Sequence, residues 1–260
     1  MSESEVVCVT GGSGCIGSWL VHLLLTRGYT VHATVKDLKD DTETKHLEAL
    51  EGASTRLRLF QIDLLQYETI VAAVRGCSGV FHLASPCIVD EVHDPQLWYP
   101  LSKTLAEKAA WDFAKEKDLD VVVVNPGTVM GPVISPRLNA SMIMLVRLLE
   151  GCDETYENFF MGSVHFKDVA LAHIMVYENK TATGRHLCVE AISHYGDFVA
   201  KVAELYPQYN VPKIPRDTQP GLLRAKDGSK KLMDLGLEFI PMEKIIKDAV
   251  ESLKSKGFIS

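Results

Sequence analysis

The stretch VVCVTGGSGCIGSWL, residues 6–20, decides the fold class of this chain. Its first five residues, Val6–Thr10, are typical of a short buried strand, and helical spacing of apolar residues begins after the glycines. Glycines at this place let the backbone turn tightly and approach a pyrophosphate, which the amide groups and the positive end of the following helix attract. A glycine turn can also serve strand–helix packing alone, but strand, turn and helix in this order favour a dinucleotide site. The predicted contacts are Gly11, Gly12, Ser13, Gly14, Cys15, Ile16 and Gly17.

Elements on both sides of this turn alternate between strand and helix. Strands are predicted at 29–35, 57–62 and 79–83, with helices at 15–27, 41–50 and 67–75. Such alternation is typical of a parallel sheet with helical crossovers. We therefore predict an α/β fold with a Rossmann-type, doubly wound parallel sheet.

The alternation is less regular after residue 83. A helix is predicted at about 100–117, followed by VVVVNPG at 121–127, a strand that is apolar throughout and therefore expected to be buried on both faces. Further helices are predicted at 142–149, 197–205, 228–235 and 241–256. We expect residues 1–183 to form the NAD(P)-binding domain, and residues 184–260 to form a mostly helical substrate lobe that packs on it and is not independent.

Composition narrows the class of protein. The chain has 260 residues, 47% of them apolar, and a net charge of −7, so a sizeable core is expected and nucleic acid is an unlikely partner. The six cysteines form no CxxC pair, which indicates neither a zinc site nor a disulfide framework. The acidic N-terminus and the lack of a long apolar run predict a cytoplasmic protein without a membrane span. The sequence leaves the oligomeric state open.

The residue after the second predicted strand indicates which nicotinamide cofactor binds. An acid there often holds the ribose 2′-hydroxyl of NAD, whereas a cation accommodates the 2′-phosphate of NADP. Lys36 occupies this position and Asp37 follows, so we predict NADP; the alternative is a solvated Lys36 with Asp37 on the ribose. The ends of the next two strands also face such a ligand. There Asp63 and Leu64 are expected at the adenine, and Ala84 and Ser85 at the middle of the cofactor.

Tyr99 and Lys103 lie one helical turn apart, on one face of the predicted helix. A free tyrosine has a pKa of about 10, and a neighbouring ammonium favours its phenolate. Such a pair suits proton donation to a carbonyl that receives a hydride. In isolation the pattern is common and usually structural, but together with the glycine turn it indicates a reductase.

The motifs TGGSGCIG, HLASP, YPLSKTLAE, NPGTVMGP and VHFKDVALAH resemble the extended short-chain dehydrogenase/reductases, in particular the cinnamoyl-CoA reductase and dihydroflavonol reductase group of phenylpropanoid metabolism. The resemblance implies an NADP(H)-dependent oxidoreductase that reduces a small-molecule carbonyl. It also implies that Tyr99 donates the proton, that Lys103 activates it, and that Pro126 and Val129 lie against the nicotinamide. We interpret residues 165–168 as mainly structural; the alternative is that His165 touches the substrate.

The chain departs from this family in the motif around the tyrosine. Cinnamoyl-CoA reductases carry NWYCYGK where this chain has LWYPLSK at 97–103. The difference favours an aromatic aldehyde or a ketone over a cinnamoyl-CoA-like thioester, although all three remain candidate substrates.

A larger departure precedes that motif. Relatives place a helix, a strand and a loop between their Ala-Ser-Pro and the tyrosine, and that strand ends in a catalytic serine or threonine. Only fifteen positions separate Ala84 from Tyr99 here, so one βα unit of ~30 residues or more is predicted to be missing. Either the strand at 121–127 moves ~5 Å into the vacant position, or it stays and leaves a hole with bare strand edges. Reduction with impaired activity is then expected; the alternative is a shortened, catalytically weak nucleotide-binding form with a regulatory role or none. Ser85, Ser102 and Thr128 are candidate replacements for the missing hydroxyl.

Overall fold

The computed structural model describes residues 5–85, 95–151, 155–216, 223, 225 and 227–260, with residues 95–100 described only as helix backbone. The first half of the chain contains β1 (Val6–Thr10), α1 (Cys15–Thr26), β2 (Thr30–Val35), α2 (Asp41–Glu48), α3 (Ala53–Arg56), β3 (Leu57–Gln61), α4 (Tyr67–Val74) and β4 (Gly79–His82). The four strands form one parallel sheet in the order β3-β2-β1-β4. This part follows the predicted Rossmann-type alternation, with each predicted boundary within two residues of the observed one; the four-residue helix α3 was not predicted.

The second half forms smaller sheets with helices around them. Its elements are α5 (Pro95–Lys117), β5 (Val122–Pro126), β6 (Thr128–Met130), α6 (Ala140–Glu150), β7 (Thr155–Tyr156), β8 (Phe160–His165), α7 (Phe166–Glu178), β9 (Gly184–Cys188), β10 (Ala191–His194), α8 (Tyr195–Leu205), β11 (Ile214–Pro215), α9 (Lys230–Asp234) and α10 (Met242–Ser255). Strand β5 pairs in parallel with β9, β8 lies between β6 and β10, and β11 pairs with β7. Because β9 lies beyond residue 183, the predicted C-terminal lobe supplies a strand to β5; the domain boundary itself stays a prediction.

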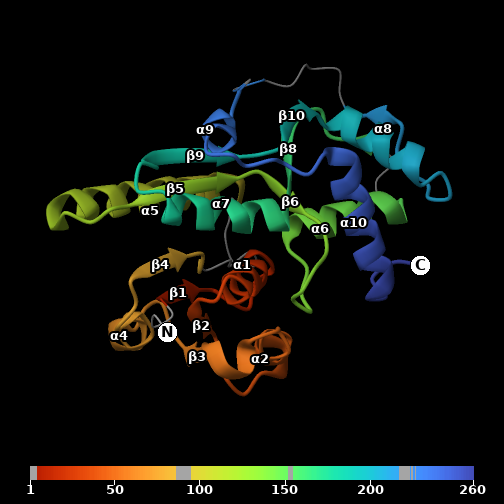
Figure 1. Cartoon of the computed structure of the whole chain (residues 1–260). Coiled ribbons are helices and arrows are strands. Elements are labelled where there is room, and N and C mark those ends of the chain that lie inside the picture. Colours follow the sequence, from red (N-terminus) through yellow and green to blue (C-terminus); the bar gives the residue numbers. More distant parts are fainter. Residues whose placement is uncertain (1–4, 86–94, 152–154, 217–222, 224, 226) are drawn as a thin grey trace.

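The parallel sheet is interrupted between β4 and β5. Among the described residues, β4 pairs only with β1, and β5 pairs only with β9. Figure 1 shows the two strands in different halves of the molecule, the first half red to gold and the second yellow-green to blue. Of the two outcomes expected for a missing βα unit, the second is therefore observed, because β5 has not moved against β4.

The burial of β5 differs from the prediction. A strand with four consecutive valines was expected to be buried on both faces, but residues 121–126 are all only half-buried. On the other side of the interruption, Val80 of β4 is 46% exposed. Both strands carry the composition of a central strand, yet each lacks one neighbour among the described residues.

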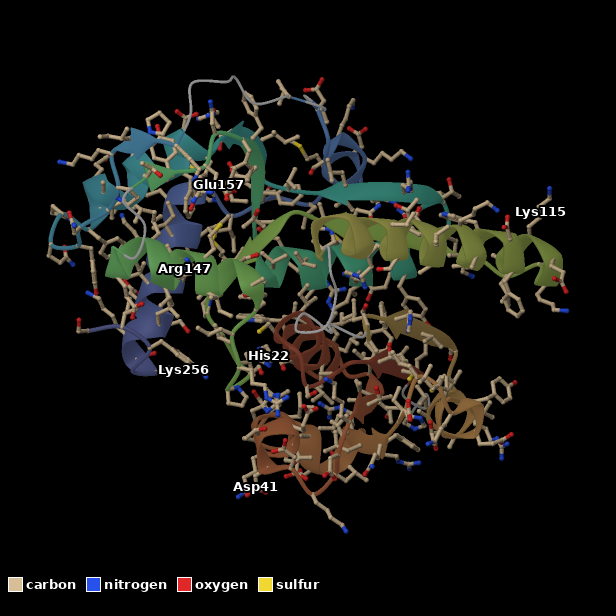
Figure 2. All side chains as sticks on the ribbon, turned by 180° about the vertical axis from the view of Figure 1, so that it is seen from behind. His22, Asp41, Lys115, Arg147, Glu157 and Lys256 are labelled. Carbon is tan, nitrogen blue, oxygen red and sulfur yellow. The ribbon has the colours of Figure 1, made fainter. Side chains whose placement is uncertain are left out.

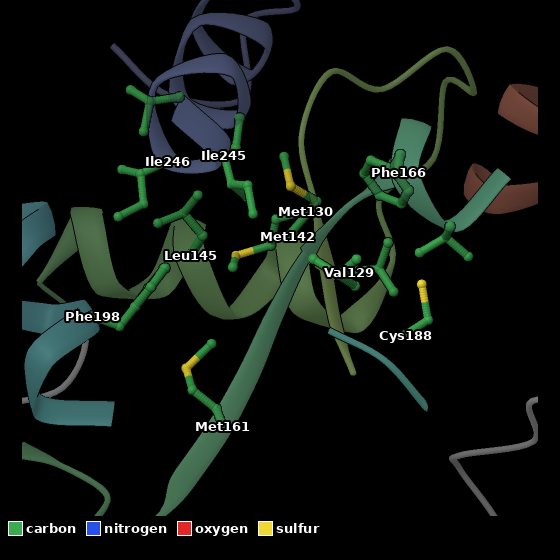
Figure 3. Close-up of a cluster of buried hydrophobic side chains, with 14 of the residues drawn as sticks. Val129, Met130, Met142, Leu145, Met161, Phe166, Cys188, Phe198, Ile245 and Ile246 are labelled. Atoms are coloured by element: carbon green, nitrogen blue, oxygen red, sulfur yellow. The ribbon is translucent and has the colours of Figure 1, made fainter. Parts of the chain in front are cut away.

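Helix α7 joins the two halves. Its residues Ala170 and Ile174 pack with α1 and the first sheet, in a core that includes Leu20 and Leu24. The other face of α7 contributes Phe166 and further apolar residues to a second core. Figure 3 shows part of that second core, where side chains of β6, β8, α6, α8 and α10 meet, including Met130, Met142, Met161, Phe198 and Ile245.

Helix α5 is longer than predicted and largely uncovered. Over residues 101–117 only Ala114 is buried, while Leu105 and Phe113 are 56% and 54% exposed. Glu107 attaches the helix to β9: its carboxylate accepts two hydrogen bonds from the Arg185 guanidinium, at 2.5 and 3.0 Å. In Figure 2 the helix extends away from the body of the protein, with Lys115 near its outer end. In the part of the chain that the structure describes, no helix has the length and hydropathy needed to cross a bilayer.

Candidate active site

The glycine turn lies at the carboxyl end of β1 and is held by β2. Gly11 adopts a φ of +69°, a conformation that favours glycine. Its amide donates to Thr34 Oγ1 at 3.0 Å, and the amide of Gly12 donates to the Thr34 carbonyl at 2.9 Å. Thr34 therefore fixes the turn with its side chain and its backbone. The sequence prediction did not include Thr34, which lies next to last in β2 and carries no motif of its own.

The other glycines of the turn differ in what surrounds them. A Cβ on Gly17 would lie 2.1 Å from the Gly11 carbonyl oxygen, and one on Gly12 would lie 2.8 Å from the Ala33 methyl group. A Cβ on Gly14 would meet only the Gly11 carbonyl oxygen, at 3.4 Å. Gly12 and Gly17 are therefore required for packing, whereas Gly14 borders open space.

The N-terminus of α1 has the properties of a phosphate site. Helices α2, α6, α7 and α8 each have a side chain that accepts from their first-turn amides. Helix α1 begins after Gly14 with no such cap and with no acidic residue in its first turn. The positive end of its dipole therefore faces the glycine turn without a side chain to neutralise it. This arrangement fits the pyrophosphate of a dinucleotide.

Thr10, the last residue of β1, connects β1 to the end of β4. Its Oγ1 accepts from the amides of Leu83 and Ala84, at 3.1 and 3.2 Å, and lies 2.9 Å from Nδ1 of His82. With both lone pairs of the hydroxyl engaged, its proton is donated to Nδ1, so hydrogen-bond counting assigns the His82 proton to Nε2. Desolvation lowers the pKa of His82, and the nearby Lys103 ammonium lowers it further. His82 is therefore neutral at physiological pH.

Lys103 brings helix α5 to this same edge of the sheet. Its Nζ donates to Oγ of Ser85, three residues after the end of β4. Two residues predicted for different roles, one for cofactor binding and one for catalysis, are thus in contact. Tyr99 belongs to the same helix as Lys103, as predicted, but its side chain lies outside the described residues.

Lys36 follows β2 with its side chain exposed, as expected for a residue that meets a ligand. Its amide lies 3.4 Å from the carboxylate of Glu43, a buried residue of α2 that also accepts from the Ser13 hydroxyl. Sequence analysis did not single out Glu43, because an acid in the first turn of a helix is an ordinary stabilising feature.

The remaining residues predicted to contact the cofactor lie after β3 and in β5 and β6. After β3, Asp63 accepts from the Leu65 amide at 2.9 Å and closes a turn, with Leu64 half-buried beside it. Pro126 ends β5, and Val129 is 4% exposed in the core of the second half. Contact of these four residues with the cofactor stays a prediction.

His165 is buried, in agreement with a mainly structural role. Its Nδ1 accepts from the Lys167 amide at 3.0 Å and so caps α7. Its ring packs edge-on against Trp19 of α1, with a centroid distance of 5.9 Å, and lies directly beneath Gly131. Burial lowers the pKa of His165 to about 4, although Asp248 acts in the opposite direction.

Known proteins match this arrangement over nearly the whole chain. Cinnamoyl-CoA reductase CAD2 of Medicago truncatula is 40% identical over 325 aligned positions, which cover 99% of this chain and 99% of the relative. The chain belongs to the short-chain dehydrogenase/reductases, in the cinnamoyl-CoA reductase group. The members of this family are oxidoreductases, as the sequence motifs predicted. A family model described as GDP-mannose 4,6 dehydratase matches residues 8–99.

Solved structures show the same fold. Vestitone reductase from alfalfa (Medicago sativa) superimposes with a TM-score of 0.84 at 29% identity, covering 98% of this chain and 99% of the other. Yeast Gre2, a methylglyoxal/isovaleraldehyde reductase solved with NADPH, has a TM-score of 0.80 at 22% identity and covers 98% and 100% of the two chains. The latter likeness concerns the fold alone.

The alignment also measures what this chain lacks. It runs over 325 positions, whereas the chain has 260 residues, so at least 65 residues of the Medicago relative have no counterpart here. A single βα unit needs about 30 residues or more. The difference is therefore large enough for the missing unit, and the break between β4 and β5 is where the described sheet lacks a strand.

Proposed function

We propose that the chain is an NADP(H)-dependent carbonyl reductase with low turnover. The contact of Lys103 with Ser85 carries this proposal, because it holds the helix of the proton-donating tyrosine at the strand ends where the glycine turn lies. The exposed Lys36 at the end of β2 supports NADP over NAD.

Each group of the chain has a distinct part in this proposal. The bound cofactor supplies a hydride to the carbonyl carbon. The uncapped α1 terminus and its glycines bind the pyrophosphate, and Thr10 fixes the loop after β4 against that turn. Tyr99 donates the proton to the carbonyl oxygen, and the Lys103 ammonium favours the phenolate that remains. Transfer of a hydride and a proton converts an aldehyde or ketone to an alcohol.

The low turnover follows from the missing unit. In the family the missing strand ends in a hydroxyl residue that donates to the same carbonyl oxygen. Loss of one such donor typically lowers turnover by ~10²–10³. Substrates that need no CoA subsite, namely aromatic aldehydes and ketones, are favoured over thioesters because residues 97–103 depart from the cinnamoyl-CoA reductase motif.

The test is oxidation of NADPH by the purified protein in the presence of an aldehyde, ketone and thioester panel, beside a full-length relative. We expect measurable turnover that is at least ~10²-fold slower than that of the relative. A rate equal to the relative's would refute the impairment. Ser85→Ala, Ser102→Ala and Thr128→Ala would then identify a replacement donor.

A second candidate function is a nucleotide-binding form that catalyses almost nothing. The half-buried valine strand and the exposed face of α5 favour it, since both leave the tyrosine helix weakly supported. The same assay separates the candidates: cofactor binding without carbonyl-dependent oxidation for any member of the panel supports the second and overturns the first.

A further inference from the structure

A buried carboxylate joins three segments beside the glycine turn. Glu43 is 4% exposed, and its Oε2 accepts from Ser13 Oγ at 2.5 Å and lies 3.4 Å from the Lys36 amide. Its Oε1 accepts from Nη1 of Arg137 at 2.7 Å. The glycine turn, the end of β2 and the loop after β6 therefore meet at one negative charge.

Arg137 lies 94 residues from Glu43 in the sequence and makes further contacts at this place. Its Nη2 donates to Asp40 Oδ2 at 3.0 Å and to Thr42 Oγ1 at 2.8 Å, and its carbonyl oxygen accepts from the Cys15 thiol at 3.1 Å. The pKa of Asp40 is lowered, mainly by its bonds from Thr42 and in part by the Arg137 charge. Even so, the Arg137 side chain keeps 56% of its surface exposed.

The carboxylates of Glu43 and Asp40 and the guanidinium of Arg137 have opposite effects on the binding of a phosphorylated ribose. Without Arg137, the carboxylates of Glu43 and Asp40 would repel a dianionic 2′-phosphate placed at the end of β2, where Lys36 is the first residue. With Arg137, one of the two carboxylate charges is neutralised. A guanidinium that keeps 56% of its side-chain surface exposed then remains in a cluster that also contacts the Lys36 backbone through Glu43. A guanidinium presents several donors in a plane and suits phosphate oxygens.

We propose that Arg137 sets the preference for the phosphorylated dinucleotide, and that Glu43 positions its guanidinium and tempers its charge. The inference rests on the proposed function for the identity of the cofactor. It differs from the sequence prediction, which assigned the preference to Lys36 alone. It also gives the loop of residues 131–139 a role in cofactor choice, although that loop comes from the second half of the chain.

The test measures dissociation constants of NADPH, NADH, adenosine 2′,5′-bisphosphate and AMP by calorimetry on the full chain. Arg137→Gln should weaken NADPH and the bisphosphate by about 10- to 100-fold, the size of losing one hydrogen bond between charged groups, with NADH and AMP changed less than about threefold. Glu43→Gln keeps the size of the side chain and removes its negative charge, with the amide oxygen left to accept from Arg137 and the amide NH2 placed to donate to Ser13 Oγ. NADPH should then bind more tightly relative to NADH. The two substitutions thus shift the ratio in opposite directions, which a purely structural contact would not do.

The matched control is Arg27→Gln, which breaks another arginine–glutamate pair, to Glu178 at 2.6 Å, at the far end of α1. It should leave the ratio of the NADPH and NADH constants unchanged. An Arg137→Gln variant with the parent ratio, beside a Lys36→Glu variant that loses NADPH, would overturn the inference and return the preference to Lys36. If the parent chain binds neither dinucleotide, the proposed function fails instead.

Discussion

Two buried groups at the start of α7 should give the protein opposing responses to acid. Burial lowers the pKa of His165 from 6.5 to about 4, with Lys244 and Lys167 adding to the shift and Asp248 opposing it. Burial raises the pKa of Asp168 from 3.8 to about 6; the Ile240 amide and the Lys167 charge oppose this shift, and Glu190 adds to it. The two residues are 2% and 1% exposed, so solvent screens neither charge appreciably.

The pKa shifts translate into stability with opposite signs. The contribution of His165 is present above pH 6.5 and is lost as the pH falls toward 4, because the unfolded ring takes up a proton that the folded ring does not. The contribution of Asp168 is present below pH 3.8 and is lost as the pH rises through about 6. A shift of one pKa unit corresponds to about 1.4 kcal/mol, so each residue changes the free energy of unfolding by about 3 kcal/mol. The two nearly cancel between pH 4 and 6.

Single substitutions should separate the two opposing pH dependences of the unfolding free energy. Asp168→Asn retains an acceptor for the Ile240 amide, which donates at 2.8 Å, and should lose about 3 kcal/mol of unfolding free energy between pH 7 and pH 4 relative to the parent. His165→Asn retains a cap for α7 and should gain about 2–3 kcal/mol over the same range. Urea unfolding followed by tryptophan fluorescence at half-unit pH steps measures both. Parallel pH profiles for the parent and the two variants would refute the assignment of these groups.

Three further predictions concern the site and the interruption of the sheet. Gly17→Ala should destabilise the fold by several kcal/mol, since its Cβ would lie 2.1 Å from a carbonyl oxygen, whereas Gly14→Ala should fold normally and weaken NADPH binding. Thermal melts measure the stability and calorimetry the binding, and a Gly17→Ala variant as stable as the parent would contradict the packing argument. Tyr99→Phe should abolish residual carbonyl reduction and leave the NADPH dissociation constant within about twofold, as rates and calorimetry on one preparation would show; remaining turnover would exclude Tyr99 as the proton donor. Leu105→Gln should change the unfolding free energy by at most about 0.5 kcal/mol because the side chain is 56% exposed; a loss above about 2 kcal/mol would mean that this face is covered in solution.

The first half of the fold could be predicted from the sequence because each element there has its own signal. Short apolar runs, glycine stops and helical spacing identify β1 to β4 and the helices α1, α2 and α4 within two residues, while the four-residue α3 was not predicted. Residues 160–178 gave no such prediction, although they form β8 and the thirteen-residue helix α7. Helix α7 is apolar on nearly all sides because it packs against both cores, and this removes the one-sided pattern that reveals an amphipathic helix.

The site was predictable where the backbone makes the contact and less so where side chains from distant segments meet. The glycine turn and Lys103 follow from local spacing. Thr34 and Arg137 do not, because each acts on residues far away in the sequence: Thr34 on Gly11, and Arg137 on Glu43. A single sequence carries no signal for such pairs, since nothing in the local pattern distinguishes these residues from ordinary polar ones.

The open sheet also shows why the second half does not close the break. For β5 to pair with β4, it would have to bring β9 with it, because the two strands are already paired along five residues. It would also have to move α5, which is attached to β9 through Glu107 and Arg185. Above all, it would have to shift α7, whose Ala170 and Ile174 are fixed in the core of the first sheet. Cores packed at crystalline density do not yield by a strand width without losing many contacts, each buried aliphatic side chain being worth about 1.5–3 kcal/mol.

That comparison of energies favours the open state over the closed one. A new strand pair would add a few hydrogen bonds, each worth about 1 kcal/mol net. Shearing α7 against α1 would expose several side chains that are now fully buried, at a larger total cost. The helix layer therefore holds the halves together while the sheet between them stays broken. As a consequence, the contacts described for the tyrosine helix include polar ones, Lys103 with Ser85 and Glu107 with Arg185, in place of a packed neighbouring strand. This is the physical reason to expect a reductase that binds its cofactor better than it turns over.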